Sequence, residues 1–111
     1  MSQHDDTVRL RHMLDAARKA QDFVRGRARG DLDTNEQLML ALVRLLEVIG
    51  EAAKGITPAT RQRYPAIAWK DIVGTRDRLI HGYFDVDLDI VWQIVSVDLP
   101  SLITELERVI S

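Results

Sequence analysis

The chain has 111 residues, no cysteine and a formal net charge of −2, with 46% hydrophobic and 29% charged residues. This size and composition indicate one soluble globular domain over residues 1–111, and they exclude a disulfide framework, a thiolate metal site and a globally basic protein. No apolar run reaches the ~18 residues that span a bilayer, and the N-terminus lacks the pattern of a signal peptide, so we expect a cytoplasmic protein with no membrane contact.

The charges are unevenly spread along the chain. Residues 8–30 carry seven Arg or Lys against two Asp, whereas the tail from residue 85 carries six acids and one base. A basic surface beside an acidic one would explain this spread. Solvated helix faces with balancing charges would explain it equally well, and the sequence leaves both interpretations open.

The first predicted helix runs from Asp5 to about Val24. Its residues Leu10, Leu14 and Ala17 fall on one apolar stripe at helical spacing. Residues 25–33, with two glycines, then indicate a loop.

A second helix is predicted over residues 35–55, with Asp33 or Thr34 as its N-cap. It is apolar almost all round from Leu38 to Ile49. Such a helix is usually buried on more than one side. In so small a chain, a second copy could supply the extra cover.

Thr57 as N-cap and Pro58 at the first helical position predict a short helix that ends before Pro65. Another helix is predicted over residues 68–80, with Gly82 just past its C-terminus.

A last helix is predicted from Asp87 or Asp89 to the C-terminus, kinked or split at Pro100. No segment has a convincing strand pattern. The sequence therefore predicts an all-α fold, an antiparallel bundle of four to five helices.

The segment "GTRDRLIHGYFDVD" gathers Arg76, His81 and Tyr83. These groups suit cleavage of RNA, because histidine titrates near neutral pH and can move a proton, while arginine stays charged and fits phosphate oxygens. On a straight helix His81 would lie ~140° from Arg76. We expect Gly82 to stop the helix near His81 and so release the imidazole and Tyr83 from the helical spacing.

Structural roles for the same residues remain open. His81 could be a cation at a helix C-terminus, Arg76 could pair with Glu51 or Asp77, and Tyr83 could lie over the loop. No group of residues has metal-ligand spacing, so neither a metal site nor a cofactor is expected.

"RDRLIHGYFDVD" resembles the Arg-x4-His-x-Tyr signature of the HEPN superfamily, in the form seen in HepT-like toxins. The segments "LEVIGEAAKGI" and "IVWQIVSVDLPSL" resemble other blocks of that family. The resemblance implies an all-α bundle that forms a homodimer with the motif at its interface. It also implies a metal-independent RNase toxin with Arg76 and His81 catalytic, whose nucleotidyltransferase antitoxin adenylylates Tyr83.

Two acidic residues bear on how well the functional residues of the family transfer to this sequence. Asp77 follows the motif arginine, where the family often has asparagine, and could pair with an arginine or repel RNA phosphate. Glu51 matches an acid of the family's second helix, and we expect it to pair with an arginine of the motif block, because a charge in an apolar helix needs a partner.

A second function from a different class fits the same residues. In this alternative the chain is a non-catalytic helical module that binds and positions a nucleotidyltransferase partner, and the Arg–His–Tyr cluster is only a docking or modification surface.

Overall fold

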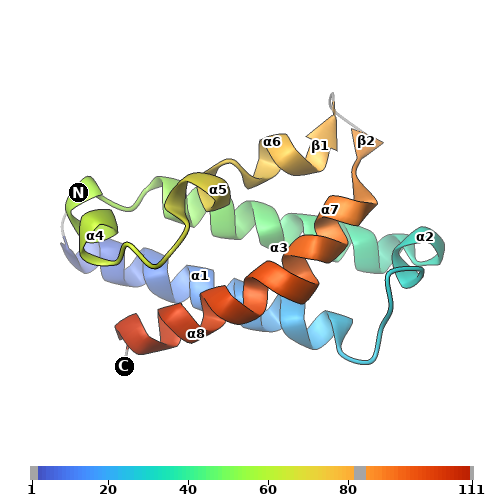
Figure 1. Cartoon of the computed structure of the whole chain (residues 1–111), viewed down its shortest axis with the longest axis horizontal. Coiled ribbons are helices and arrows are strands. Elements are labelled where there is room, and N and C mark those ends of the chain that lie inside the picture. The colour runs from blue at the N-terminus through green and yellow to red at the C-terminus, as the bar shows by residue number, and fades with distance from the viewer. Residues whose placement is uncertain (1–2, 82–84, 111) are drawn as a thin grey trace.

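The first predicted helix forms as one long element, and its apolar stripe faces the core. The computed structural model describes residues 3–81 and 85–110, and Figure 1 shows α1 (Gln3–Val24) running along the bundle. Leu10, Leu14 and Ala17 are buried as expected. They pack α1 against α3 and α8. None of the described helices is long and apolar enough to cross a membrane.

A short helix interrupts the predicted loop and moves the cap of the next helix. Residues Asp31–Thr34 form α2, so Asp33 and Thr34 are helical and neither caps α3. Asn35 is extended between the two helices, and its side chain accepts a hydrogen bond from the Leu38 N–H at 3.0 Å. The predicted cap at Asp33 or Thr34 was therefore wrong by one or two residues.

The apolar second helix, α3 (Glu36–Lys54), lies at the centre of the bundle. It packs against α1, α2, α5, α6 and α7, which confirms the expected burial on more than one side. Its outward face is not fully covered, since Leu40 is 53% exposed. The helix thus serves as the platform on which the later elements are placed.

Thr57 and Pro58 start α4 (Pro58–Arg63) as predicted. The same segment is tied to α1 by Asp6, which is only 2% exposed. The Asp6 carboxylate accepts hydrogen bonds from the Thr57 N–H at 3.0 Å and from the Thr57 hydroxyl at 2.6 Å. The Thr60 hydroxyl donates to it as well.

The predicted helix over residues 68–80 is split in two. Gly74, with φ −84° and ψ 6°, separates α5 (Trp69–Val73) from α6 (Thr75–Leu79). The chain then becomes extended at Ile80, so α6 ends at Leu79. Gly82 is therefore not the residue that stops this helix, and Gly82 and Tyr83 both lie outside the described residues.

A two-residue antiparallel ribbon follows α6, where no strand was predicted. Strand β1 (Ile80–His81) pairs with β2 (Asp85–Val86), with Ile80 opposite Val86 and His81 opposite Asp85. Two residues are too few to show a period of two in the sequence, so only the return of the chain reveals the ribbon.

The last helix begins where predicted and contains a π-helical turn just before Pro100. Asp87 caps α7 (Leu88–Gln93), a π-helical turn follows over Ile94–Asp98, and α8 (Leu99–Ile110) completes the chain. Pro100 has no N–H to give to the turn before it. The Leu99 N–H bonds the Ile94 carbonyl oxygen, one residue wider than in an α-helix. The helix widens at the proline, and the apolar stripe continues into α8.

We predict that Asp6→Asn lowers the free energy of unfolding by about 2 kcal/mol at neutral pH, because a buried charged acceptor with three donors is lost. Burial alone would raise the pKa of Asp6, but the hydrogen bonds from Thr57 and Thr60 outweigh it and hold the pKa below its ordinary 3.8. The stabilisation is therefore complete above pH ~4 and is lost as the pH falls through the lowered pKa.

Chemical denaturation of Asp6→Asn and of an exposed control, Asp15→Asn, checks this prediction at pH 7 and at pH 3. The difference between wild type and Asp6→Asn should shrink at pH 3. An equal effect of the two variants at pH 7 would contradict the role of Asp6.

Candidate active site

The helix that carries Arg76 is held closely against α3. A Cβ atom on Gly50 of α3 would lie 3.1 Å from the Ile72 carbonyl oxygen, so the glycine permits a close approach of the α5 backbone. Across the Gly74 break, the buried Thr75 hydroxyl donates to the Asp71 carbonyl oxygen at 3.2 Å. These contacts fix α6 with its Leu79 side chain in the core.

Arg76 lies on the outer side of α6 and is exposed. With Glu51 it lines a hollow of about 20 Å³ between α3 and α5–α6. Within residues 3–81 and 85–110, neither Arg76 nor Glu51 takes part in an ion pair. The predicted pairing of Glu51 with a motif arginine was therefore wrong, because Glu51 is exposed and water solvates its charge.

Asp77, which lies between Arg76 and Arg78 in the sequence, is exposed as well. The closest carboxylate oxygen to Arg78 belongs to Asp98 in the π-helical turn, with 3.8 Å between Nη2 and Oδ2. In the described part of the chain, Asp77 makes no ion pair with Arg76 or Arg78. The expected competition of Asp77 for the motif arginine is not observed.

His81 lies beyond the helix that precedes it in the chain. It is the second residue of β1 and its side chain is 63% exposed. Its Nε2 atom lies 3.5 Å from Oδ2 of Asp87. Since α6 has already ended at Leu79, His81 is not part of the last turn of that helix and directly follows its C-cap residue, Ile80.

Asp87 is the residue of this site whose role the sequence did not reveal. We expected it only as a helix cap, and it does accept a hydrogen bond from the Ile90 N–H through Oδ1, at 3.1 Å. Its other oxygen faces His81. The hydrogen bond from Ile90 lowers the pKa of Asp87 most, burial opposes it, and His81 lowers the pKa further. The carboxylate is therefore ionised at neutral pH. In the sequence, the available signal for this contact was a helix-capping residue that comes directly after a reversal of the chain.

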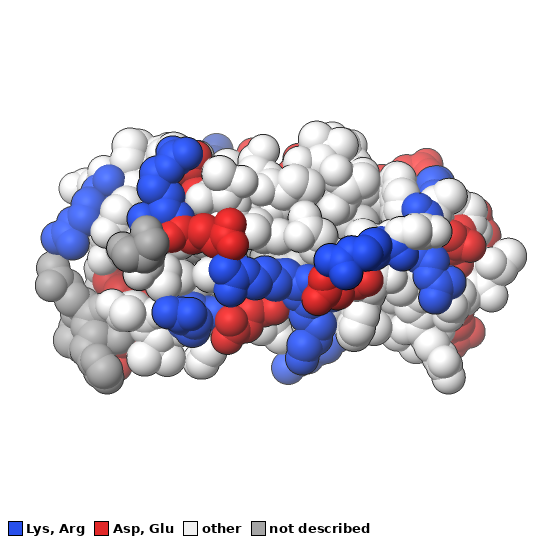
Figure 2. Space-filling model, turned by 90° about the horizontal axis from the view of Figure 1, so that it is seen from below, with Lys and Arg blue, Asp and Glu red and all other residues white. Residues whose placement is uncertain are grey.

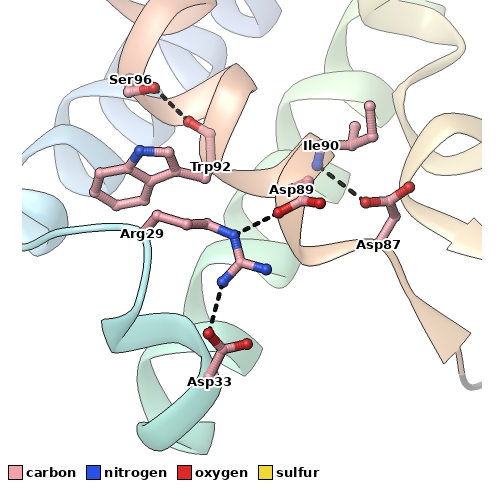
Figure 3. A network of polar contacts seen from close by, with 7 residues as sticks. All are labelled: Arg29, Asp33, Asp87, Asp89, Ile90, Trp92 and Ser96. Carbon is pink, nitrogen blue, oxygen red and sulfur yellow. Dashed lines mark hydrogen bonds and ion pairs between the residues drawn. The ribbon is translucent and has the colours of Figure 1, made fainter.

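A second polar network holds the start of α7 from the opposite side. Figure 3 shows the Arg29 guanidinium between Asp33 of α2 and Asp89 of α7, with Nε to Asp89 Oδ1 at 2.7 Å and Nη1 to Asp33 Oδ2 at 3.1 Å. These hydrogen bonds, that to Asp89 above all, raise the pKa of Arg29. The network links the loop after α1 to the helix that Asp87 caps.

Arg76 and His81 lie at opposite ends of the short helix α6, and they make no hydrogen bond to each other in the described part of the chain. Arg76 stands in the first turn of α6, and His81 stands in β1, which Figure 1 shows following directly on α6. The ~140° separation of a continuous helix no longer applies, because His81 has left the helix. No group of three or more metal-binding side chains occurs among the described residues.

Elsewhere the charges are mixed and the larger hollows are separate from the motif. Figure 2 shows Lys and Arg interspersed with Asp and Glu on one face of the molecule, which agrees with balanced helix faces. Arg18 of α1 and Glu107 of α8 form one such pair at 2.6 Å. A groove of about 470 Å³ between α1 and α3 and a hollow of about 300 Å³ beside Arg78 are both lined by residues other than Arg76 and His81.

Comparisons with known proteins agree on one family. The family model described as Ribonuclease HepT-like matches residues 13–109. A Methanocaldococcus jannaschii protein named "Putative RNase MJ1380" is 35% identical over 98% of this chain and 100% of its own length. A Thermococcus cleftensis protein named "Probable ribonuclease HepT" is 34% identical over 89% of this chain and 90% of its own. A Caldanaerobacter subterraneus protein named "Putative RNase TTE0752" is 34% identical over 91% and 90%. No solved structure gives a significant match.

Proposed function

Because the chain belongs to the HepT-like ribonuclease family, we propose that it is a metal-independent endoribonuclease and the toxin of a toxin–antitoxin pair. Arg76 and His81 are the catalytic residues of this proposal. The observation that carries it is an exposed arginine with no carboxylate partner among the described residues, followed in the same segment by an exposed histidine whose ring meets an ionised carboxylate.

The proposed reaction needs only these groups and water-exposed RNA. A base takes the proton of a ribose 2′-hydroxyl, the 2′-oxygen attacks the adjacent phosphorus, and the bond from phosphorus to the 5′-oxygen breaks. An acid returns a proton to the departing 5′-oxygen. His81 can fill the role of base or acid, and Arg76 offsets the charge that develops on the non-bridging oxygens.

The open position of the motif supports a polymeric substrate. Small ligands are usually enclosed in pockets of roughly 300–1,000 Å³. Arg76 lines a hollow of only about 20 Å³, and His81 is 63% exposed. A surface of this kind suits a chain of nucleotides that lies across it.

We predict that Arg76→Ala and His81→Ala each lower the rate of RNA cleavage roughly 100-fold or more, because a phosphate contact or a proton-transfer group is lost. Cleavage by the wild type should continue in EDTA. Gel assays with a labelled RNA measure the rate, and expression in a host cell tests for growth arrest that is lost in His81→Ala.

The matched controls are His12→Ala and Arg27→Ala, which remove an exposed histidine and an exposed arginine outside the motif. Both should cleave like the wild type. Activity abolished by EDTA and restored by magnesium would contradict the mechanism. A wild type that cleaves no RNA but binds a nucleotidyltransferase would favour the non-catalytic module.

The proposed active form is a homodimer. One chain presents a single His81, whereas the reaction needs both a base and an acid, and the partner's His81 would supply the second group. The platform helix α3 also leaves apolar surface at Leu40, which is 53% exposed, and at Val48, which is half-buried. Covering this surface would be favourable.

Light scattering at micromolar concentration should give twice the mass of one chain, because a single copy leaves this surface in water. Leu40→Glu places a charge on it and should shift the equilibrium toward the monomer, whereas Val97→Glu, a control at an exposed apolar residue outside α3, should not. A wild-type monomer at this concentration would contradict the dimer.

The proposed antitoxin is a nucleotidyltransferase that transfers AMP to Tyr83, which lies outside the described residues. The described residues on either side of Tyr83, His81 and Asp85, are both exposed, and this supports modification by a second active site. The added phosphate would compete with RNA phosphate for Arg76, a charge-assisted contact that cleavage needs.

We predict that Tyr83→Phe escapes this silencing, because it keeps the ring and lacks the acceptor oxygen. After co-expression with the nucleotidyltransferase, intact-mass spectrometry should show ~329 Da added to the wild type for each AMP, and no such addition to Tyr83→Phe. Tyr64→Phe is the matched control and should be modified like the wild type. The same added mass on Tyr83→Phe, mapped to another residue, would contradict the assignment.

A further inference from the structure

We propose that Asp87 is a positioning residue of the active site, which holds the His81 imidazole through Nε2 and leaves Nδ1 to exchange a proton with RNA. The distance from Nε2 to Asp87 Oδ2 is 3.5 Å. This inference rests on the proposed ribonuclease activity, and it adds a third residue to the two of the Arg-x4-His motif.

The backbone and side chain of Asp87 are both fixed by hydrogen bonds. Its N–H donates to the Leu79 carbonyl oxygen at 2.7 Å, which joins the start of α7 to the end of α6. Its Oδ1 accepts from the Ile90 N–H at 3.1 Å. Its Oδ2 faces the ring, and the bond to Oδ1 holds the carboxylate in place at the start of α7.

The contact of Asp87 Oδ2 with Nε2 determines which ring nitrogen of His81 is left to react with RNA. A neutral imidazole has one N–H donor and one acceptor nitrogen, and the partner of the first determines which nitrogen is left as the acceptor. In the proposed tautomer the proton is on Nε2, on the side of Asp87 Oδ2 at 3.5 Å, and the ring offers Nδ1 to the 2′-hydroxyl. After it has taken a proton there, the imidazolium is stabilised by the ionised carboxylate.

The cross-strand neighbour of His81 supplies a natural comparison. Asp85 lies opposite His81 in the ribbon and is exposed, but in the described structure it makes no ion pair with the ring. Asp89, in the first turn of α7, is 84% exposed and pairs with Arg29. Of the three carboxylates at this turn, on Asp85, Asp87 and Asp89, that of Asp87 is the one placed 3.5 Å from His81 Nε2.

Substitutions at Asp87 can separate its cap from its contact with His81. Asp87→Ser keeps an oxygen that can cap α7, but it is uncharged and too short to hold the ring. Asp87→Asn keeps the length and the cap and loses the charge. We expect kcat for RNA cleavage to fall roughly 10- to 100-fold in Asp87→Ser and at least as much in Asp87→Asn, because an amide whose oxygen caps α7 turns its NH2 toward the ring and cannot accept from Nε2–H. KM and the thermal unfolding midpoint should stay near wild type in both.

The control is Asp85→Asn, which removes a negative charge beside His81 without touching the cap of α7, and it should leave kcat near wild type. An undiminished kcat in Asp87→Ser, or an equal loss in Asp85→Asn, would overturn the inference. A fall in kcat that only follows a loss of folded protein would assign Asp87 to capping alone and would overturn it too.

Proton NMR on the unmodified chain tests the contact without reference to activity. Nuclear Overhauser effects should join the His81 ring protons to the Asp87 β-protons, and their absence would overturn the inference whatever the variants do. If these effects are present but the wild type cleaves no RNA, the proposed function fails and the catalytic role of Asp87 fails with it, while the contact stands.

Discussion

The hydrogen bond from the Asp87 N–H to the Leu79 carbonyl oxygen, 2.7 Å long, closes the chain on itself where α6 ends. Beside it the ribbon places Ile80 opposite Val86 and His81 opposite Asp85. A continuous helix would have carried His81 to another face. Because the chain turns back here instead, His81 leaves the helix, Asp87 arrives beside it, and α7 starts in the direction that leads its apolar stripe onto the core.

The same region depends on how closely α5 and α6 lie on α3. Gly50 leaves room for the Ile72 carbonyl oxygen, and the buried Thr75 hydroxyl bridges the break at Gly74. These contacts are inward, whereas the side chain of Arg76 is exposed. A buried arginine would need a carboxylate partner and would be unavailable to a phosphate. The packing thus keeps the guanidinium in water, where a ligand can reach it.

Much of the architecture could be predicted from local signals. Thr57 with Pro58, and Asp87 as a cap, act within one turn of the chain, so their roles are visible in the sequence. The apolar residues of α3 likewise predicted its central place. The errors arose where distant segments decide the outcome. The ribbon forms only because the chain returns, and Glu51 needs no partner because its side of α3 faces water. The contact of Asp87 with His81 depends on that same return, so the resemblance to a family motif pointed to His81 and not to the residue that holds it.

The central claim is that Arg76 and His81 cleave RNA through its own 2′-hydroxyl, and the ends of the products test it most directly. Attack by the 2′-oxygen leaves a 2′,3′-cyclic phosphate on one fragment and a 5′-hydroxyl on the other, and replacement of the ribose at the cleaved position by deoxyribose should stop the reaction. Mass spectrometry of the fragments from the purified chain distinguishes these ends. Fragments with 3′-hydroxyl and 5′-phosphate ends, or cleavage at the deoxyribose, would contradict the account.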